Sequence, residues 1–81
     1  MNDKKDLPIY AIKLKRFRQS KGLSQKEFAA LIGASEISIS SYERGARRPK
    51  DKTMRIMAKK TGLDIYEVFF NEELETLPCR K

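Results

Sequence analysis

Three cations stand within four residues around Pro49, and their spacing suits a polyanionic partner. Arg47, Arg48 and Lys50 form a short basic loop. Guanidinium and ammonium groups that follow one another along a loop can track the phosphates of one nucleic-acid strand. A solvated basic loop would have the same composition, but these cations directly follow a polar helix-forming segment, residues 35–44. We therefore expect the loop to contact phosphate.

The sequence contains few of the residues that usually act as activated nucleophiles or bind metal ions. The chain has no histidine, which is the commonest general base and metal ligand. Its serines therefore lack that activating partner, and helix caps and ion pairs account for the carboxylates. The single cysteine, Cys79, cannot form an internal disulfide and is expected to be an inert thiol. We expect no enzymatic activity, no metal and no cofactor.

The charge of the chain is uneven. Lys and Arg total 18 against 11 Asp and Glu, which gives a net charge of +7 over 81 residues. Residues 1–60 hold 16 of the basic and six of the acidic side chains, whereas residues 61–81 hold two and five. This basic body indicates a partner such as nucleic acid or an anionic membrane.

The apolar pattern argues against the membrane. The longest apolar run, residues 28–32, is too short to span a bilayer or to form a signal core. The cations are also spread over several glycine-separated segments and do not face one broad apolar stripe. We expect a cytoplasmic protein with no membrane contact.

Capping residues and glycines divide the chain into short helices, which predicts an all-α fold. Tyr10, Leu14 and Phe17 share one face of a first helix, which ends just before Gly22. Residues 24–27 form a capping box for a second helix of about two turns. A glycine at position 33 ends that helix.

Three further helices follow. Ser35 is expected to cap a third helix, which Gly45 ends. Asp51 or Thr53 is expected to cap a fourth helix, and residues 64–67 repeat the capping-box pattern for a short fifth one.

The domain organisation follows from these helices. We expect a flexible arm over residues 1–8, one compact domain over residues 9–70 and a loosely ordered tail over residues 71–81. A second folded domain does not fit in the remaining length.

The second and third helices, joined at Gly33, suit a helix-turn-helix. Ala29 keeps the second helix slim where the third one crosses it, and Ile39 anchors the third helix inward. The opposite faces of the third helix are then free to enter a DNA major groove. They carry Glu36, Ile37, Ser40, Ser41 and Arg44.

These segments together resemble the Cro/phage-repressor-type (Xre-like) helix-turn-helix family. The resemblance covers roughly residues 14–69 and is carried by Gly22-Leu23-Ser24-Gln25, Phe28-Ala29, Gly33, Ile39-Ser40, Tyr42-Glu43-Arg44-Gly45, Pro49, Ala58 and Gly62-Leu63. It implies a compact five-helix, lambda-repressor-like domain that reads the major groove with its third helix. It also implies a transcriptional regulator, with repression favoured, that binds a double-stranded DNA operator as a homodimer.

The resemblance assigns roles to single residues. Gln25 matches a position that grips a phosphate and can brace the third helix. Groove chemistry would let Ile37 pack on a thymine methyl and Glu36 accept from a cytosine amino group, although Glu36 could instead complement the helix dipole. The positions that match base-reading residues are Ser35, Glu36, Ile37 and Ser41, and those nearer the backbone are Ser38, Ser40 and Arg44.

Two more sets of charged residues are singled out. Arg18 and Glu43 match positions that form an internal salt bridge between the first and third helices of related phage repressors. Three lysines are additional candidates for the rim of the DNA-binding surface. They are Lys13, Lys21 and Lys26.

Some apolar residues exceed what a small core needs. Ile56 occupies a position that is usually polar in the family. Tyr66 and Phe70 lie beside the inward Val68 and Phe69, and these four side chains cannot all point inward on so short a helix. A dimer interface is one explanation, and core packing or isolated surface positions are the others. Two further functions stay open, namely an antitoxin or other regulator controlled by a protein partner, and a protein-interaction adaptor that does not bind DNA.

Overall fold

The expected all-α fold is confirmed. A computed structural model describes residues 7–71, and these residues form five helices and no strand. The helices are α1 (Ile9–Ser20), α2 (Gln25–Ile32), α3 (Glu36–Glu43), α4 (Asp51–Thr61) and the π-helical turn η2 (Tyr66–Phe70). The expected fifth helix is therefore present, but it is a single turn of the wider π type.

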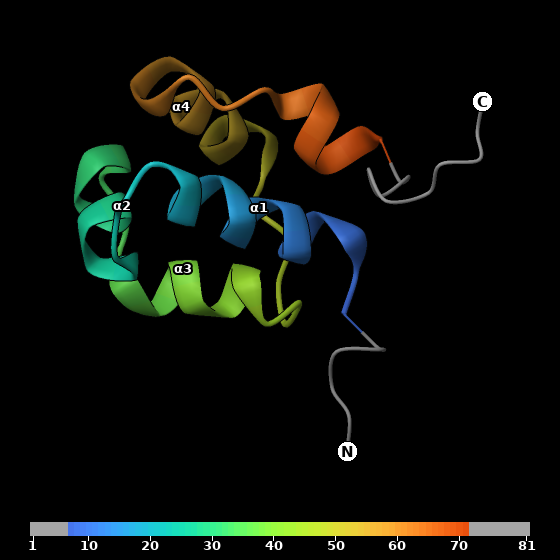
Figure 1. Cartoon of the computed structure of the whole chain (residues 1–81), viewed down its shortest axis with the longest axis horizontal. Coiled ribbons are helices and arrows are strands. Elements are labelled where there is room, and N and C mark those ends of the chain that lie inside the picture. The colour runs from blue at the N-terminus through green and yellow to red at the C-terminus, as the bar shows by residue number, and fades with distance from the viewer. Residues whose placement is uncertain (1–6, 72–81) are drawn as a thin grey trace.

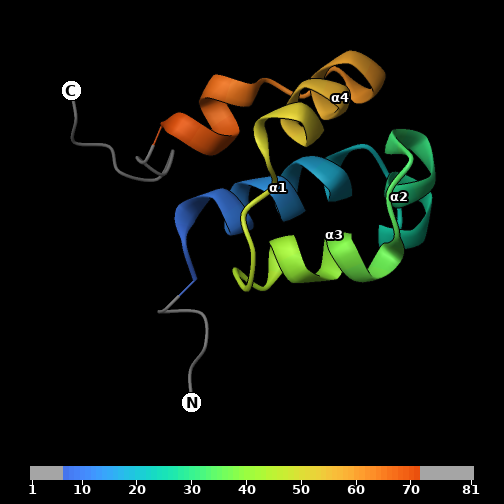
Figure 2. The same ribbon diagram turned by 180° about the vertical axis from the view of Figure 1, so that it is seen from behind.

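α1 lies in the middle of the molecule. α3 runs along one side of α1, and α4 and η2 lie on the other side (Figure 1). The view from behind shows the same order (Figure 2). α2 contacts both α3 and α4, so it closes one end of the arrangement. The outer faces of α3 and α4 consequently point in opposite directions.

One core joins these helices. Four large side chains are fully buried, and they come from four different helices: Leu14, Phe28, Ile39 and Met57. Their burial confirms that Ile39 is the inward anchor of α3. Buried Val68 and Phe69 attach η2 to the same cluster, whereas Tyr10 and Phe17 are only partly buried against it.

The caps around α2 follow the expected pattern. The Ser24 hydroxyl accepts from the Glu27 amide at 3.0 Å, and the Glu27 carboxylate accepts from the Ser24 amide at 2.8 Å. Gly33 ends the helix with φ +72°, which is left-handed backbone that residues with a Cβ rarely adopt. The short turn to α3 is thus set by residues close in sequence.

The expected cap of α4 is wrong. Asp51 and Thr53 both lie inside the helix, and Lys50 occupies the N-cap position without a capping hydrogen bond from its side chain. Asp51 is instead the first helical residue, where its negative charge complements the positive end of the helix dipole. The helix therefore begins immediately after the Pro49-Lys50 segment.

The start of η2 follows the expected pattern in part. An Asp64 carboxylate oxygen accepts from the Glu67 amide at 3.1 Å, as a capping residue would. The Glu67 carboxylate pairs with Lys13 of α1 at 3.1 Å. This acid thus ties η2 to α1.

Candidate nucleic-acid interface

α3 is fixed on one face and open on the other. The Ser35 hydroxyl caps its start by accepting from the Ser38 amide at 3.1 Å, and Ile39 and Tyr42 hold it to the core. Ile37 points away from that core and is 76% exposed. Of the other predicted groove residues, Glu36 and Arg44 are exposed, and the three serines at 38, 40 and 41 are half-buried.

Two arginines lie along the serines of α3. The Arg44 guanidinium is 3.3 Å from the Ser40 hydroxyl and 3.4 Å from that of Ser41. The Arg47 guanidinium donates to the Ser38 hydroxyl at 3.1 Å and lies 5.4 Å from the centre of the Tyr42 ring. The structure thereby brings the predicted polar residues of α3 together with two cations on one surface, which has the donors that a DNA backbone requires.

A buried ion pair between α1 and α3 holds this surface in place. Arg18 Nε donates to Glu43 Oε2 at 2.7 Å, and Arg18 Nη2 donates to Glu43 Oε1 at 3.0 Å. Arg18 also donates to the Leu23 carbonyl at 2.8 Å, so the α1–α2 turn is included. The hydrogen bond to Glu43 raises the pKa of the Arg18 guanidinium, which keeps this side chain charged.

Gln25 completes this network. Its amide donates to Glu43 Oε1 at 3.1 Å from the first residue of α2. The Gln25 side chain therefore braces α3, which is one of the two roles that the resemblance implies. The phosphate contact expected of the same residue stays a prediction.

Two cations of the expected surface lie elsewhere. The guanidinium of Arg48 donates to the Phe69 carbonyl of η2 at 3.0 Å, away from α3. Lys13 is only 5% exposed and donates to the Glu67 and Asn71 carbonyls at 3.1 and 2.9 Å, so the expectation that it lies on the rim is wrong. Both cations thus bind carbonyls in or just after η2, an element that is remote from them in sequence.

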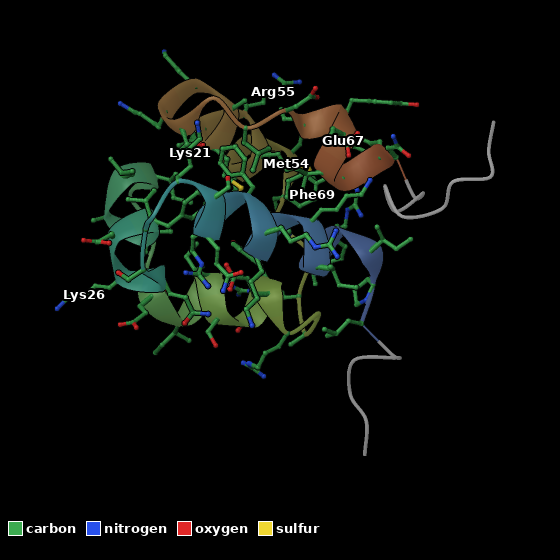
Figure 3. All side chains as sticks on the ribbon, in the orientation of Figure 1. Lys21, Lys26, Met54, Arg55, Glu67 and Phe69 are labelled. Carbon is green, nitrogen blue, oxygen red and sulfur yellow. The ribbon has the colours of Figure 1, made fainter. Side chains whose placement is uncertain are left out.

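The remaining rim lysines differ in position. Lys26 projects from the end of α2 into solvent (Figure 3). Lys21 folds over the Phe17 ring, with its ammonium 5.3 Å from the ring centre. Lys50 is exposed at the N-cap position of α4, directly after the basic loop.

The three residues predicted for a dimer interface differ in their exposure to solvent. Tyr66 and Phe70 are 67% and 53% exposed on η2, opposite α3. Ile56 is half-buried and packs against the core, so core packing already accounts for much of its side chain. The dimer itself stays a prediction.

Other site chemistry is not indicated by the part of the chain that the structure describes. Over residues 7–71 no three acidic, histidine or cysteine side chains cluster in a way that could hold a metal ion. Within the same residues, no helix is long and apolar enough to cross a bilayer.

Comparison with known proteins identifies the class. A helix-turn-helix family model matches residues 14–68, which is more than half of the chain and includes α2 and α3. The chain belongs to this helix-turn-helix family, which confirms the resemblance seen in the sequence. The family consists of DNA-binding transcriptional regulators and is not enzymatic.

Two proteins are similar to this chain in sequence. The cryptic phage CTXphi transcriptional repressor RstR of Vibrio cholerae is 31% identical over 65 residues, which cover 80% of this chain and 59% of the repressor. The uncharacterized HTH-type transcriptional regulator y4dJ of Sinorhizobium fredii is 40% identical over 53 residues, which cover 65% of this chain and 69% of the relative. The chain thus spans about three fifths of the length of the first relative.

Proposed function

We propose that this chain is a sequence-specific regulator of transcription that places α3 in the major groove of double-stranded DNA and acts as a repressor. The observation that carries this proposal is the exposed side of α3, where Ile37 projects into solvent and where the guanidinium groups of Arg44 and Arg47 bond to serines of the same helix. The buried Arg18–Glu43 pair fixes the helix that bears this face. A cytoplasmic location follows from the DNA partner.

The residues divide by the part of DNA that they would contact. Residues near the start of α3 read base edges, because the first turns of a recognition helix lie deepest in the groove. They are Ser35, Glu36 and Ile37, together with Ser41, which lies four residues after Ile37 on the same face. Contacts to the sugar-phosphate backbone then fall to Gln25, Ser38, Ser40, Arg44, Arg47 and Lys50, which flank them.

A homodimer on a roughly palindromic operator is part of this proposal. Tyr66 and Phe70 provide exposed aromatic surface on η2, opposite α3. A repressor related to this chain supports repression over activation. Control by a protein partner, as in an antitoxin, would instead act through the acidic C-terminal segment, most of which lies outside the described residues 7–71.

The salt dependence of DNA binding tests the proposal. The affinity for a short mixed-sequence duplex should fall steeply with salt, because phosphate contacts release counterions. Arg44→Gln and Arg47→Gln should each reduce the slope of log affinity against log salt by about 0.9. Fluorescence anisotropy over a series of salt concentrations measures these slopes.

Arg55→Gln is the matched control. It removes the same charge from α4, on the side of the molecule opposite α3 (Figure 3), where Arg55 pairs only with exposed Asp51 among described carboxylates. The slope should not change in this variant. If the wild-type chain binds no duplex, or if the control lowers the slope as much as the α3 variants do, the function proposed here is wrong and an adaptor role is favoured.

A further inference from the structure

Arg47 and Arg48 are adjacent in sequence, but their side chains extend to opposite sides of the loop. Arg47 turns to α3 and donates to Ser38. Arg48 turns to η2, on the far side of α1, and donates to the Phe69 carbonyl. Because residues 47–50 have no helical backbone, successive side chains can point in opposite directions.

Arg48 is held by several groups at once. Its guanidinium carbon lies 5.3 Å from the centre of the Tyr10 ring, 5.7 Å from that of Phe69 and 5.2 Å from that of Phe70. The hydrogen bond to the Phe69 carbonyl measures 3.0 Å. A planar guanidinium can stack on rings while it donates in its own plane, and an ammonium cannot do both. The site therefore fits arginine specifically.

The other side of the same loop is tied to α1. The Tyr10 hydroxyl donates to the Arg47 carbonyl at 2.8 Å, and the next proline, Pro49, is buried. Burial raises the pKa of the Tyr10 phenol, although the Arg48 charge acts in the opposite direction, so the phenol remains protonated and can donate at neutral pH. Tyr10 and Arg48 together fix the backbone that carries Arg47.

We propose that Arg48 is a positioning residue, which ties the loop after α3 to η2 and holds Arg47 and Lys50 where they meet phosphate, without contacting phosphate itself. To reach DNA, Arg48 would have to give up the Phe69 carbonyl and three aromatic rings. The part of this inference that concerns phosphate contact by Arg47 and Lys50 rests on the proposed DNA-binding function. The part that concerns the attachment of the loop to η2 does not.

Two substitutions separate positioning from phosphate contact. Arg48→Gln removes the charge, and Arg48→Lys retains the charge but not the stacked, in-plane donor geometry. If Arg48 positions the loop, both variants should bind a mixed-sequence duplex about 2- to 30-fold more weakly and lower the salt slope to the same extent, because Arg47 and Lys50 then lose phosphate contact whether or not position 48 keeps its charge. In both, the amides of η2 should exchange with solvent faster than in the wild-type chain.

Arg47→Gln is the matched control from the neighbouring residue. It should lower the salt slope by about 0.9 and leave amide exchange in η2 unchanged. All measurements are made well below the unfolding temperature of each variant, so that a loss of affinity does not arise from unfolded chain.

Three results would overturn the inference. A lower slope in Arg48→Gln that Arg48→Lys restores would make Arg48 a phosphate contact. Unchanged DNA affinity in both variants would make it a residue of stability alone. Unchanged amide exchange in η2 would remove the tie between the loop and η2, and this result can be obtained even if the wild-type chain binds no duplex and the proposed function has failed.

Discussion

At the scale of single residues, Glu43 is the side chain that joins α3 to both α1 and α2. Its two carboxylate oxygens accept from Arg18 at 2.7 and 3.0 Å, and Oε1 also accepts from Gln25 at 3.1 Å. The three residues belong to three different helices. A change at Glu43 therefore affects the position of α3 relative to both α1 and α2.

Glu43→Ala should destabilise the fold strongly. It leaves the Arg18 guanidinium buried without its acid, a loss that costs about 3–5 kcal/mol. Glu36→Ala, which removes an exposed acid from the same helix, should change the free energy of unfolding by about 0.5 kcal/mol or less. Urea unfolding followed by circular dichroism measures both values.

A double variant keeps this prediction testable if Glu43→Ala does not fold. Arg18→Met combined with Glu43→Leu replaces the ion pair by apolar side chains and should recover most of the lost stability. Equal losses for Glu36→Ala and Glu43→Ala would contradict the structural role of the pair.

The sequence indicated some of these roles and missed others. Exposure of Ile37 and burial of Ile39 could be predicted, because helical periodicity within α3 separates the two faces. The locations of Lys13 and Arg48 could not, because both cations bind carbonyls at the end of η2. That end is remote in sequence, and a single turn gives little periodicity from which to place it.

At the scale of elements, local chemistry was the reliable guide. The capping box of α2 and the glycine that ends it depend only on neighbouring residues, and both occur as predicted. The start of α4 was predicted wrongly. Asp51 and Thr53 are both residue types that commonly cap helices, but the helix begins at Asp51, directly after buried Pro49 and the N-cap residue Lys50. The π-helical form of η2 has no sequence signal that we can identify.

Two glycines with similar backbone should respond differently to alanine. Gly33 and Gly45 have φ values of +72° and +74°, so either substitution places a Cβ in left-handed backbone at a cost of about 1–2 kcal/mol. A Cβ at Gly33 meets no atom within 4 Å, whereas one at Gly45 would lie 2.5 Å from Cδ of Pro8. We expect Gly45→Ala to lower the melting temperature more than Gly33→Ala does.

Differential scanning calorimetry decides this comparison. A larger shift for Gly45→Ala would show that the chain before α1 packs against the end of α3. Equal shifts would mean that the Pro8 ring does not hold that position.

At the scale of the whole molecule, the two proposed surfaces lie on opposite sides of α1. α3 carries the residues proposed to read the groove, and η2, on the other side of α1 (Figure 1), carries the exposed aromatics Tyr66 and Phe70. A dimer that pairs through η2 can bind one operator only where the pairing turns both copies of α3 toward the same duplex. Two linked half-site contacts then bind a full operator more tightly than either contact alone.

Tyr66→Ala should shift a concentration-dependent dimer toward monomer, because it removes the more exposed of the two aromatic side chains on η2. Binding to a full operator should weaken more than binding to a single half-site. Leu31→Ala, at an exposed position on α2, is the control and should leave the dimer unchanged. Sedimentation velocity over a range of concentrations measures the shift, and an unchanged profile for Tyr66→Ala would remove the aromatic from the interface.

The most direct test of the central claim is a binding selection from random duplex DNA with the wild-type chain, Ile37→Ala and Ser41→Ala at one salt concentration. Ile37 and Ser41 lie four residues apart on one face of α3, so both should affect base choice. Ile37→Ala should reduce discrimination at one position of each half-site by about 1–3 kcal/mol, with affinity for unrelated duplex nearly unchanged. Identical selected sequences for all three chains would contradict the account, because α3 would then not read DNA through this face.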